Sequence, residues 1–206
     1  MRPVDRTLAD RTGQIYQTHA RAWDASRDTS LFERGWLDRI LAHAPDGPVL
    51  DLGCGAGDPI ARYFIDAGRA LTGVDIAPAM LDLARARWPD QTWVEADMRS
   101  LDLGQRFAAL VAFNSFFHLP PEDQPPMFAR FAAHLRPGGV LWFSAGPGAG
   151  EVTGTVAGEP VYHASLSPED YRAHLSGAGF EAIDFVPEDP ACRGHSLWFA
   201  KLKSAI

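Results

Sequence analysis

A short glycine-rich segment between an apolar run and a helical stretch constrains the fold more than any other part of the chain. Residues 49–52 read Val-Leu-Asp-Leu, and Gly53, Gly55 and Gly57 follow at alternate positions. Glycines at such a junction let the backbone turn sharply and let a ligand approach the main chain closely. The next apolar run ends in Asp75, which predicts a second strand with a carboxylate at its C-terminal end. In open α/β sheets nucleotides bind at that edge, and such an acid hydrogen-bonds ribose hydroxyls.

The spacing of the glycines argues against a dinucleotide. The pattern GxGxxG would place its third glycine at position 58, where the chain has Asp58. A carboxylate beside the N-terminus of a helix is poorly placed to receive a pyrophosphate. The turn therefore suits a nucleoside ligand without phosphates better than NAD.

The composition is that of one globular domain. Of the 206 residues 46% are apolar and 22% are charged, and the formal net charge is −7. A net-negative surface repels phosphate backbones, so we expect no nucleic-acid partner. Two cysteines, Cys54 and Cys192, are too few for a disulfide framework, and no apolar run has the length of a signal peptide or a membrane span. We expect a cytoplasmic protein with reduced thiols and no membrane partner, either a monomer or a homodimer.

Short apolar runs alternate with helical stretches, the pattern of a parallel sheet flanked by helices. Strands are predicted over residues 49–52, 70–75, 92–95, 108–114, 140–145, 181–186 and 196–202. Helices are predicted over residues 8–25, 30–43, 58–67, 78–88, 122–135 and 167–176. The glycine-rich segment 146–164 has no clear period, which leaves a long loop and a small β-excursion as alternatives.

The segment from Asp51 to Gly57 resembles the first motif of class I S-adenosylmethionine-dependent methyltransferases. The likeness continues at Asp75, at Asp97-Met98, and at the Leu-Arg-Pro-Gly-Gly of 135–139. It covers roughly residues 10–203, and small bacterial members of the family share the motifs SFFHL and YHASL. The resemblance implies an α/β, Rossmann-like fold: a seven-stranded, mostly parallel sheet with its last strand antiparallel and helices on both faces.

The resemblance also implies a division of the chain around the cofactor. One domain, 1–206, would carry an N-terminal helical cap over residues 1–45 and a lid insertion over residues 146–165. Tyr16 and Trp23 resemble aromatic positions with which relatives cover the cofactor. Arg27 would meet the cofactor's carboxylate, with a solvated helix face as the alternative.

Each part of the cofactor has an implied partner. Asp51 and the backbone of residues 53–57 would line the methionine end, and Asn114 and Ser115 would lie beneath the sulfonium. Asp75 would bind the ribose hydroxyls. Ile76 would contact the adenine ring, and the backbone of Met98 would meet the same ring. Asp97 would accept a hydrogen bond from the adenine amino group, with a surface helix cap as the alternative role. The full predicted set for S-adenosylmethionine, and for S-adenosylhomocysteine as product, is Tyr16, Trp23, Arg27, Asp51, Gly53, Cys54, Gly55, Gly57, Asp75, Ile76, Met80, Asp97, Met98, Asn114 and Ser115.

The candidate general base is His118, just past a strand that should end beside the cofactor. Its ordinary pKa of about 6.5 suits proton removal at neutral pH, but a structural role at the turn is an equal alternative. Phe117, Tyr162 and His163 complete a candidate substrate pocket, with core packing for Phe117 and a capped loop for the other two as alternatives. His195 and Trp36 are predicted to be structural. The seven histidines lack metal-ligand spacing, so no metal is predicted.

Methyl transfer from a sulfonium to a small-molecule acceptor is the function that this resemblance implies. The alternative is a protein that binds S-adenosylmethionine or S-adenosylhomocysteine without turnover, since its cofactor motifs would look the same. An NAD-dependent oxidoreductase is a weaker alternative, because Asp58 and the glycine spacing oppose it.

Overall fold

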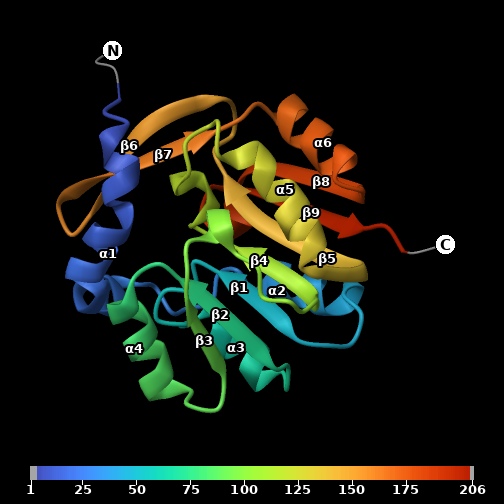
Figure 1. Ribbon diagram of the computed structural model, residues 1–206, viewed down its shortest axis with the longest axis horizontal. Coiled ribbons are helices and arrows are strands. Elements are labelled where there is room, and N and C mark those ends of the chain that lie inside the picture. Colours follow the sequence, from blue (N-terminus) through green and yellow to red (C-terminus); the bar gives the residue numbers. More distant parts are fainter. Residues whose placement is uncertain (1–3, 205–206) are drawn as a thin grey trace.

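The computed structural model describes residues 4–204, so the first three residues of the predicted cap lie outside the described part. Its larger sheet has seven strands in the order β3-β2-β1-β4-β5-β9-β8, and β9 runs antiparallel to both β5 and β8 (Figure 1). The predicted fold class is therefore confirmed. The strands are β1 (Val49–Leu52), β2 (Leu71–Asp75), β3 (Thr92–Glu95), β4 (Phe107–Ala112), β5 (Leu135–Ala145), β8 (Phe180–Asp189) and β9 (His195–Leu202).

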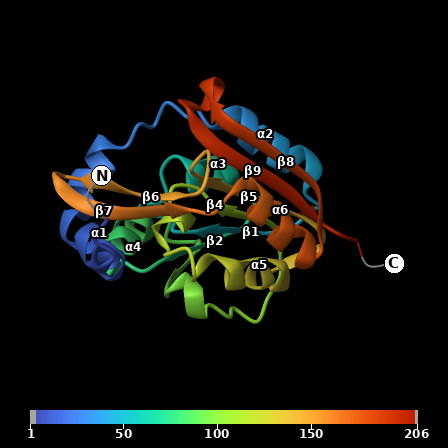
Figure 2. The same cartoon turned by 90° about the horizontal axis from the view of Figure 1, so that it is seen from above.

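Helices cover both faces of this sheet, with α2 and α3 on one side and α5 on the other (Figure 2). Side chains of successive β-strand residues point to opposite faces, so each buried strand feeds two apolar cores. Leu50 and Leu110 pack in the core with α5 and α6, whereas Val49 and Ala109 pack in the core with α2, α3 and α4. The helices are α2 (Arg34–His43), α3 (Ile60–Asp66), α4 (Pro78–Arg87), α5 (Gln124–Ala133) and α6 (Pro168–Gly177).

Several predicted boundaries differ from the structure, among them that of the helix over residues 30–43, which begins at Arg34. The helix predicted to end at residue 135 ends at Ala133, and the Leu-Arg-Pro-Gly-Gly of 135–139 belongs to β5. Leu135 pairs with Phe107 before the register shifts, so this strand begins earlier than its apolar pattern indicates. The helix predicted from residue 58 begins at Ile60, after Pro59.

The glycine-rich segment forms a β-hairpin rather than a loop. Strands β6 (Gly150–Val156) and β7 (Glu159–Ser165) pair antiparallel and are joined by Ala157 and Gly158, which both have positive φ. The hairpin lies beside α1 (Thr7–Ser26), at the side of the molecule away from the C-terminus (Figure 1).

Polar contacts fix α1 to this hairpin. Arg6 Nη2 lies 2.6 Å from Glu151 Oε1, and His19 Nε2 lies 2.6 Å from Glu159 Oε1. The helix is thereby held across the carboxyl edge of the parallel strands. Within residues 4–204, no helix combines the length and the apolar character that a membrane crossing requires.

Candidate functional site

A cavity of about 670 Å³ lies where the parallel strands end, between the sheet edge and α1. The glycine turn after β1, the ends of β2 and β3, and the segment after β4 form its floor. Every residue of the predicted cofactor set except Gly57 contributes to the lining, and so does His118. Topology explains this gathering, because parallel strands bring residues far apart in sequence to the same edge of the sheet.

Four predicted site residues lie behind the cavity wall and not in its lining. A Cβ on Gly57 would point at the rings of Trp88 and Trp93, away from the cavity. Phe117 packs edge-on against His163, with 4.6 Å between ring centroids. Tyr162 is fully buried and its hydroxyl donates to Glu151 at 2.6 Å. The hairpin therefore packs behind the residues that line the cavity. The sequence pattern did not indicate this arrangement.

Asp75 ties the end of β2 to the glycine turn. Its carboxylate accepts hydrogen bonds from Gly55 N at 2.8 Å and from Ala77 N at 2.9 Å. Burial raises the pKa of this carboxyl group, although the backbone donors oppose the change. The left-handed backbone at Gly53 (φ 73°) and Gly55 (φ 54°) makes the close turn, and a Cβ on Gly53 would collide with Ser115.

Asp51 presents an unpartnered carboxylate oxygen at the cavity wall. The residue is 3% exposed, and its Oδ2 has no hydrogen-bond partner within the described chain. Burial and the nearby charge of Asp75 raise the pKa of Asp51 to about 7, and Arg27 opposes the rise. A buried acceptor without a partner is costly, so this oxygen is poised for a ligand group that donates hydrogen bonds.

Arg27 lines the cavity and is not on a solvated helix face. Its guanidinium forms an ion pair with Glu33, which is fully buried, and donates to Asp28 O at 2.8 Å. Glu33 Oε2 has no partner in the described residues. Glu33 was not predicted from the sequence. Its position directly before a helix with the apolar residues Trp36 and Leu37 could have indicated a buried acid.

His118 and Tyr16 form a hydrogen-bonded pair in the cavity lining. His118 Nδ1 lies 2.8 Å from the backbone oxygen of Tyr162, which can only accept, so Nδ1 carries the proton. Neutral His118 must then accept through Nε2, and the hydroxyl of Tyr16 donates to it at 3.1 Å. Burial lowers the pKa of His118 to about 4, and the neighbouring His163 adds to the effect. The expectation of an ordinary imidazole pKa is therefore wrong.

This lowered pKa predicts a pH-dependent loss of stability. Between about pH 4 and 6.5 the unfolded chain binds a proton at His118 that the folded chain does not, so the free energy of unfolding falls as pH falls. The contribution from pH 7 to pH 5 is about 2 kcal/mol. Urea denaturation at both pH values should show a smaller drop for His118→Gln than for the unaltered chain. Equal drops would contradict a neutral, buried His118.

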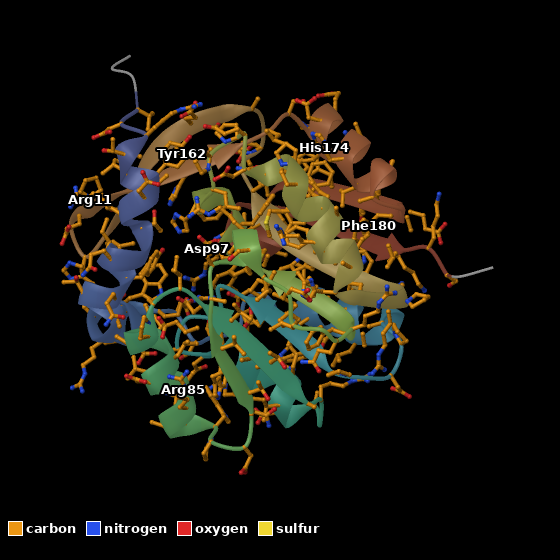
Figure 3. All side chains as sticks on the ribbon, viewed as in Figure 1. Arg11, Arg85, Asp97, Tyr162, His174 and Phe180 are labelled. Atoms are coloured by element: carbon orange, nitrogen blue, oxygen red, sulfur yellow. The ribbon has the colours of Figure 1, made fainter. Side chains whose placement is uncertain are left out.

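Asp97 is both a local cap and part of the lining. Its carboxylate accepts from Arg99 N at 2.8 Å and from Arg99 Nη2 at 2.6 Å. Burial opposes ionisation, but these bonds and the charge of Arg99 lower the pKa of Asp97. Figure 3 shows Asp97 between α1 and α5. The cap considered from the sequence is thus present, and the residue still faces the cavity.

Sequence reasoning also missed most of one face of α1. Asp10, Gly13, Gln14 and Gln17 line the cavity on the same stretch of helix as Tyr16. Their spacing of three to four residues marks one helix face and could have indicated them once Tyr16 was chosen. Gln17 also accepts from Ala79 N at 2.8 Å and so fixes α1 to α4. Within residues 4–204 there is no cluster of three or more side chains suited to a metal ion.

A sequence profile described as a methyltransferase domain matches residues 49–139, which span the glycine turn, Asp75, Asp97 and the segment with His118. Residues 49–139 therefore carry a methyltransferase domain. This confirms the family that the sequence motifs indicated.

The proteins that this chain resembles in sequence and structure are also methyltransferases. An aminosugar N,N-dimethyltransferase from Streptomyces venezuelae (dTDP-3-amino-3,4,6-trideoxy-alpha-D-glucopyranose N,N-dimethyltransferase) is 35% identical over 52% of this chain and 48% of its own length. Malonyl-[acyl-carrier protein] O-methyltransferase from Serratia marcescens is 34% identical over 61% and 48%. The SAM-bound structure of CalS10, an amino pentose methyltransferase from Micromonospora echinaspora, superposes with a TM-score of 0.69 at 26% identity over 91% of this chain and 96% of CalS10. The chain spans about half the length of the curated relatives it matches.

Proposed function

We propose that the chain transfers a methyl group from S-adenosylmethionine to a small-molecule acceptor. The observation that carries the proposal is the cavity of about 670 Å³ that brings Arg27, Asp51, Asp75 and Asp97 together at the sheet edge. These four side chains suit the four polar parts of this cofactor: carboxylate, ammonium, ribose and adenine amino group. The methyltransferase domain supplies the family context.

The residues present fit the cofactor. Asp51 Oδ2, buried and unpartnered, would gain a donor from the methionine ammonium, and Arg27 would meet the carboxylate. Asp75 would bind the ribose hydroxyls while it holds the turn. Ile76 is 48% exposed although apolar, which suits a side chain that an adenine ring covers. The remaining proposed contacts are Met80, Met98 and Asp97 with the adenine side, Gly53, Cys54 and Gly55 with the methionine side, and Asn114 and Ser115 beneath the sulfonium.

When bound, the cofactor supplies a methyl group on a positively charged sulfur. The chain's own contribution is alignment of the acceptor with that methyl group and exclusion of water, which supplies up to about 7–11 kcal/mol of the barrier. Tyr16 and Trp23 on α1 form the roof, and the hairpin behind them keeps α1 in place. We propose that α1 and the hairpin together act as the cap.

Names of similar proteins support a small acceptor. Two of them are aminosugar N,N-dimethyltransferases. The formal charge of −7 supports the absence of a nucleic-acid partner.

Cys54 and Cys192 are both free thiols, in agreement with the proposed cytoplasmic location. The proposed assembly is a monomer or a homodimer.

Two measurements test the proposal. Calorimetry should show S-adenosylhomocysteine bound with a Kd in the micromolar range, and NADH should not bind. Methyl-labelled S-adenosylmethionine should then lose its label to a compound in a fractionated small-molecule extract. Binding of S-adenosylhomocysteine without transfer of label to any compound of the extract would identify a non-catalytic binding protein. Absence of S-adenosylhomocysteine binding would refute the proposed function.

A further inference from the structure

The cavity lining is short of cations that could hold an anionic acceptor. Among the described residues that form it are six aspartates, two arginines and no lysine. Both arginines are already paired: Arg27 with the buried Glu33, and Arg99 with Asp97 at 2.6 Å and with Asp123 at 3.1 Å. Under the proposed function Arg27 also meets the cofactor's carboxylate. An acceptor that carries a carboxylate or phosphate would find no arginine left to neutralise it.

The imidazole in the lining does not supply the missing charge. Burial keeps His118 neutral, although its donor bond to the backbone oxygen of Tyr162 opposes the lowering of its pKa. Its Nε2 is occupied as the acceptor of the Tyr16 hydroxyl at 3.1 Å. The ring therefore offers an anion neither a charge nor a free N–H.

The same hydrogen bond determines what Tyr16 can offer. The proton of its hydroxyl is directed at His118, and burial together with the charge of Asp75 raises the pKa of Tyr16, so the phenol stays protonated. Only the lone pairs of its oxygen remain for a ligand in the cavity. Those lone pairs accept from an N–H or O–H group, whereas a carboxylate has no proton to give them.

The carboxylates of the lining also favour a cationic ligand. Asp51 lines the cavity and its buried Oδ2 has no partner among the described residues, and Asp75 lies close enough to raise the pKa of Asp51. Three of the lining aspartates are paired with arginines (Asp24, Asp58 and Asp97), and the other three have no ion pair among the described residues. Cationic ligands are favoured in such a cavity and anions are repelled.

We propose that the methyl acceptor is an amine, and that carboxylates and phosphates are excluded. This inference rests on the proposed function. The amine binds as its ammonium form and first loses one proton to solvent. The lone pair of the resulting neutral amine then forms the C–N bond while the electron pair of the C–S bond returns to sulfur, so the positive charge moves from sulfur to the product nitrogen. This step needs no base. An alcohol hydroxyl would have to lose a proton of pKa near that of water, about 16, for which a buried neutral imidazole is a weak base.

Matched probes test the acceptor class. Protein saturated with S-adenosylhomocysteine is titrated with benzylamine and benzoate, with cyclohexylamine and cyclohexanecarboxylate, and with glucosamine and glucuronate. In the pair that binds best, the amine should have a Kd at least tenfold lower than that of the carboxylate. A carboxylate that binds as tightly as its amine, or absence of binding by all six probes, would overturn the inference. Binding of S-adenosylhomocysteine itself, measured first, separates this outcome from failure of the proposed function.

Two variants locate the preference in the cavity. Gln14 and Thr18 are both exposed, lie one turn apart on α1 and are hydrogen-bonded to each other, but only Gln14 lines the cavity. Gln14→Lys should reduce the amine preference at least fivefold, and Thr18→Lys should leave it unchanged. An equal loss in both would attribute the preference to the overall charge of −7 and overturn the assignment.

The product itself gives a second readout. Methyl label carried by a product amine should resist alkaline hydrolysis. Label released as methanol would identify a methyl ester and refute an amine acceptor.

Discussion

Asp75→Ala should weaken the binding of S-adenosylhomocysteine by about 3–4 kcal/mol, a loss of more than a hundredfold in affinity. Two ribose hydroxyls would each lose a bond to a charged group, and such bonds contribute about 1.5–3 kcal/mol each. The turn would loosen as well, because Asp75 accepts from Gly55 N at 2.8 Å and from Ala77 N at 2.9 Å. Calorimetry with both proteins at the same pH and salt concentration measures the difference.

Two further variants make this result specific. Asp75→Asn keeps the shape and one acceptor oxygen, so its affinity should lie between those of the unaltered chain and Asp75→Ala. Asp82→Ala removes an exposed carboxylate from α4, where it pairs only with Arg85 among the described residues, and should bind normally. A loss below fivefold for Asp75→Ala, in a protein that melts as a folded domain, would rule out Asp75 as the ribose ligand.

Gly57→Ala should lower the free energy of unfolding by about 2–4 kcal/mol. One part of the cost is conformational, because φ at Gly57 is 81° and L-residues lose about 1–2 kcal/mol there. Another part is steric: the new Cβ would lie 2.8 Å from Trp88 Cζ3 and 3.1 Å from Trp93 Cη2. Chemical denaturation measures the sum.

Gly68→Ala separates the conformational cost from the steric cost. Gly68 has a similar φ of 75°, but nothing lies within 4 Å of the Cβ that alanine would add. This variant should lose only the conformational part, about 1–2 kcal/mol. If both variants lost the same amount, the tryptophan rings would be moving aside without cost, and the packing explanation would fail.

The inner strands of the main sheet (β1, β2, β4, β5 and β9) could be predicted because each contains an apolar run that packs on both faces. The hairpin could not be predicted in the same way, since strands of residues 150–156 and 159–165 mix exposed and buried positions without regular alternation. The early start of β5 was hidden by Pro137 and two glycines, which signal a turn in isolation. The pairing of β5 with β4 passes over these three residues through a register shift between Phe107 and Ala109, which is a tertiary feature.

The gathering of the proposed cofactor residues at one sheet edge was predictable, because the glycine turn follows β1, Asp75 ends β2 and Asp97 follows β3. The acceptor side was not, because its chemistry depends on contacts between distant segments. His118 meets Tyr16, 102 residues earlier, and the backbone of Tyr162, 44 residues later. Neither contact changes the identity of His118, yet together they decide its tautomer and its charge. Spacing in a single sequence carries no record of such contacts.

The position of α1 has a consequence for how the cleft is assembled during synthesis. This helix leaves the ribosome before its partners Glu151 and Glu159, which are made about 140 residues later. At about 5–20 residues per second, several seconds pass before the roof can settle on the floor. Until then its apolar residues Leu8 and Ile15 have neither β6 nor β7 to cover them. Helix α1 is therefore made well before the hairpin and can take its final position only after the hairpin has been made.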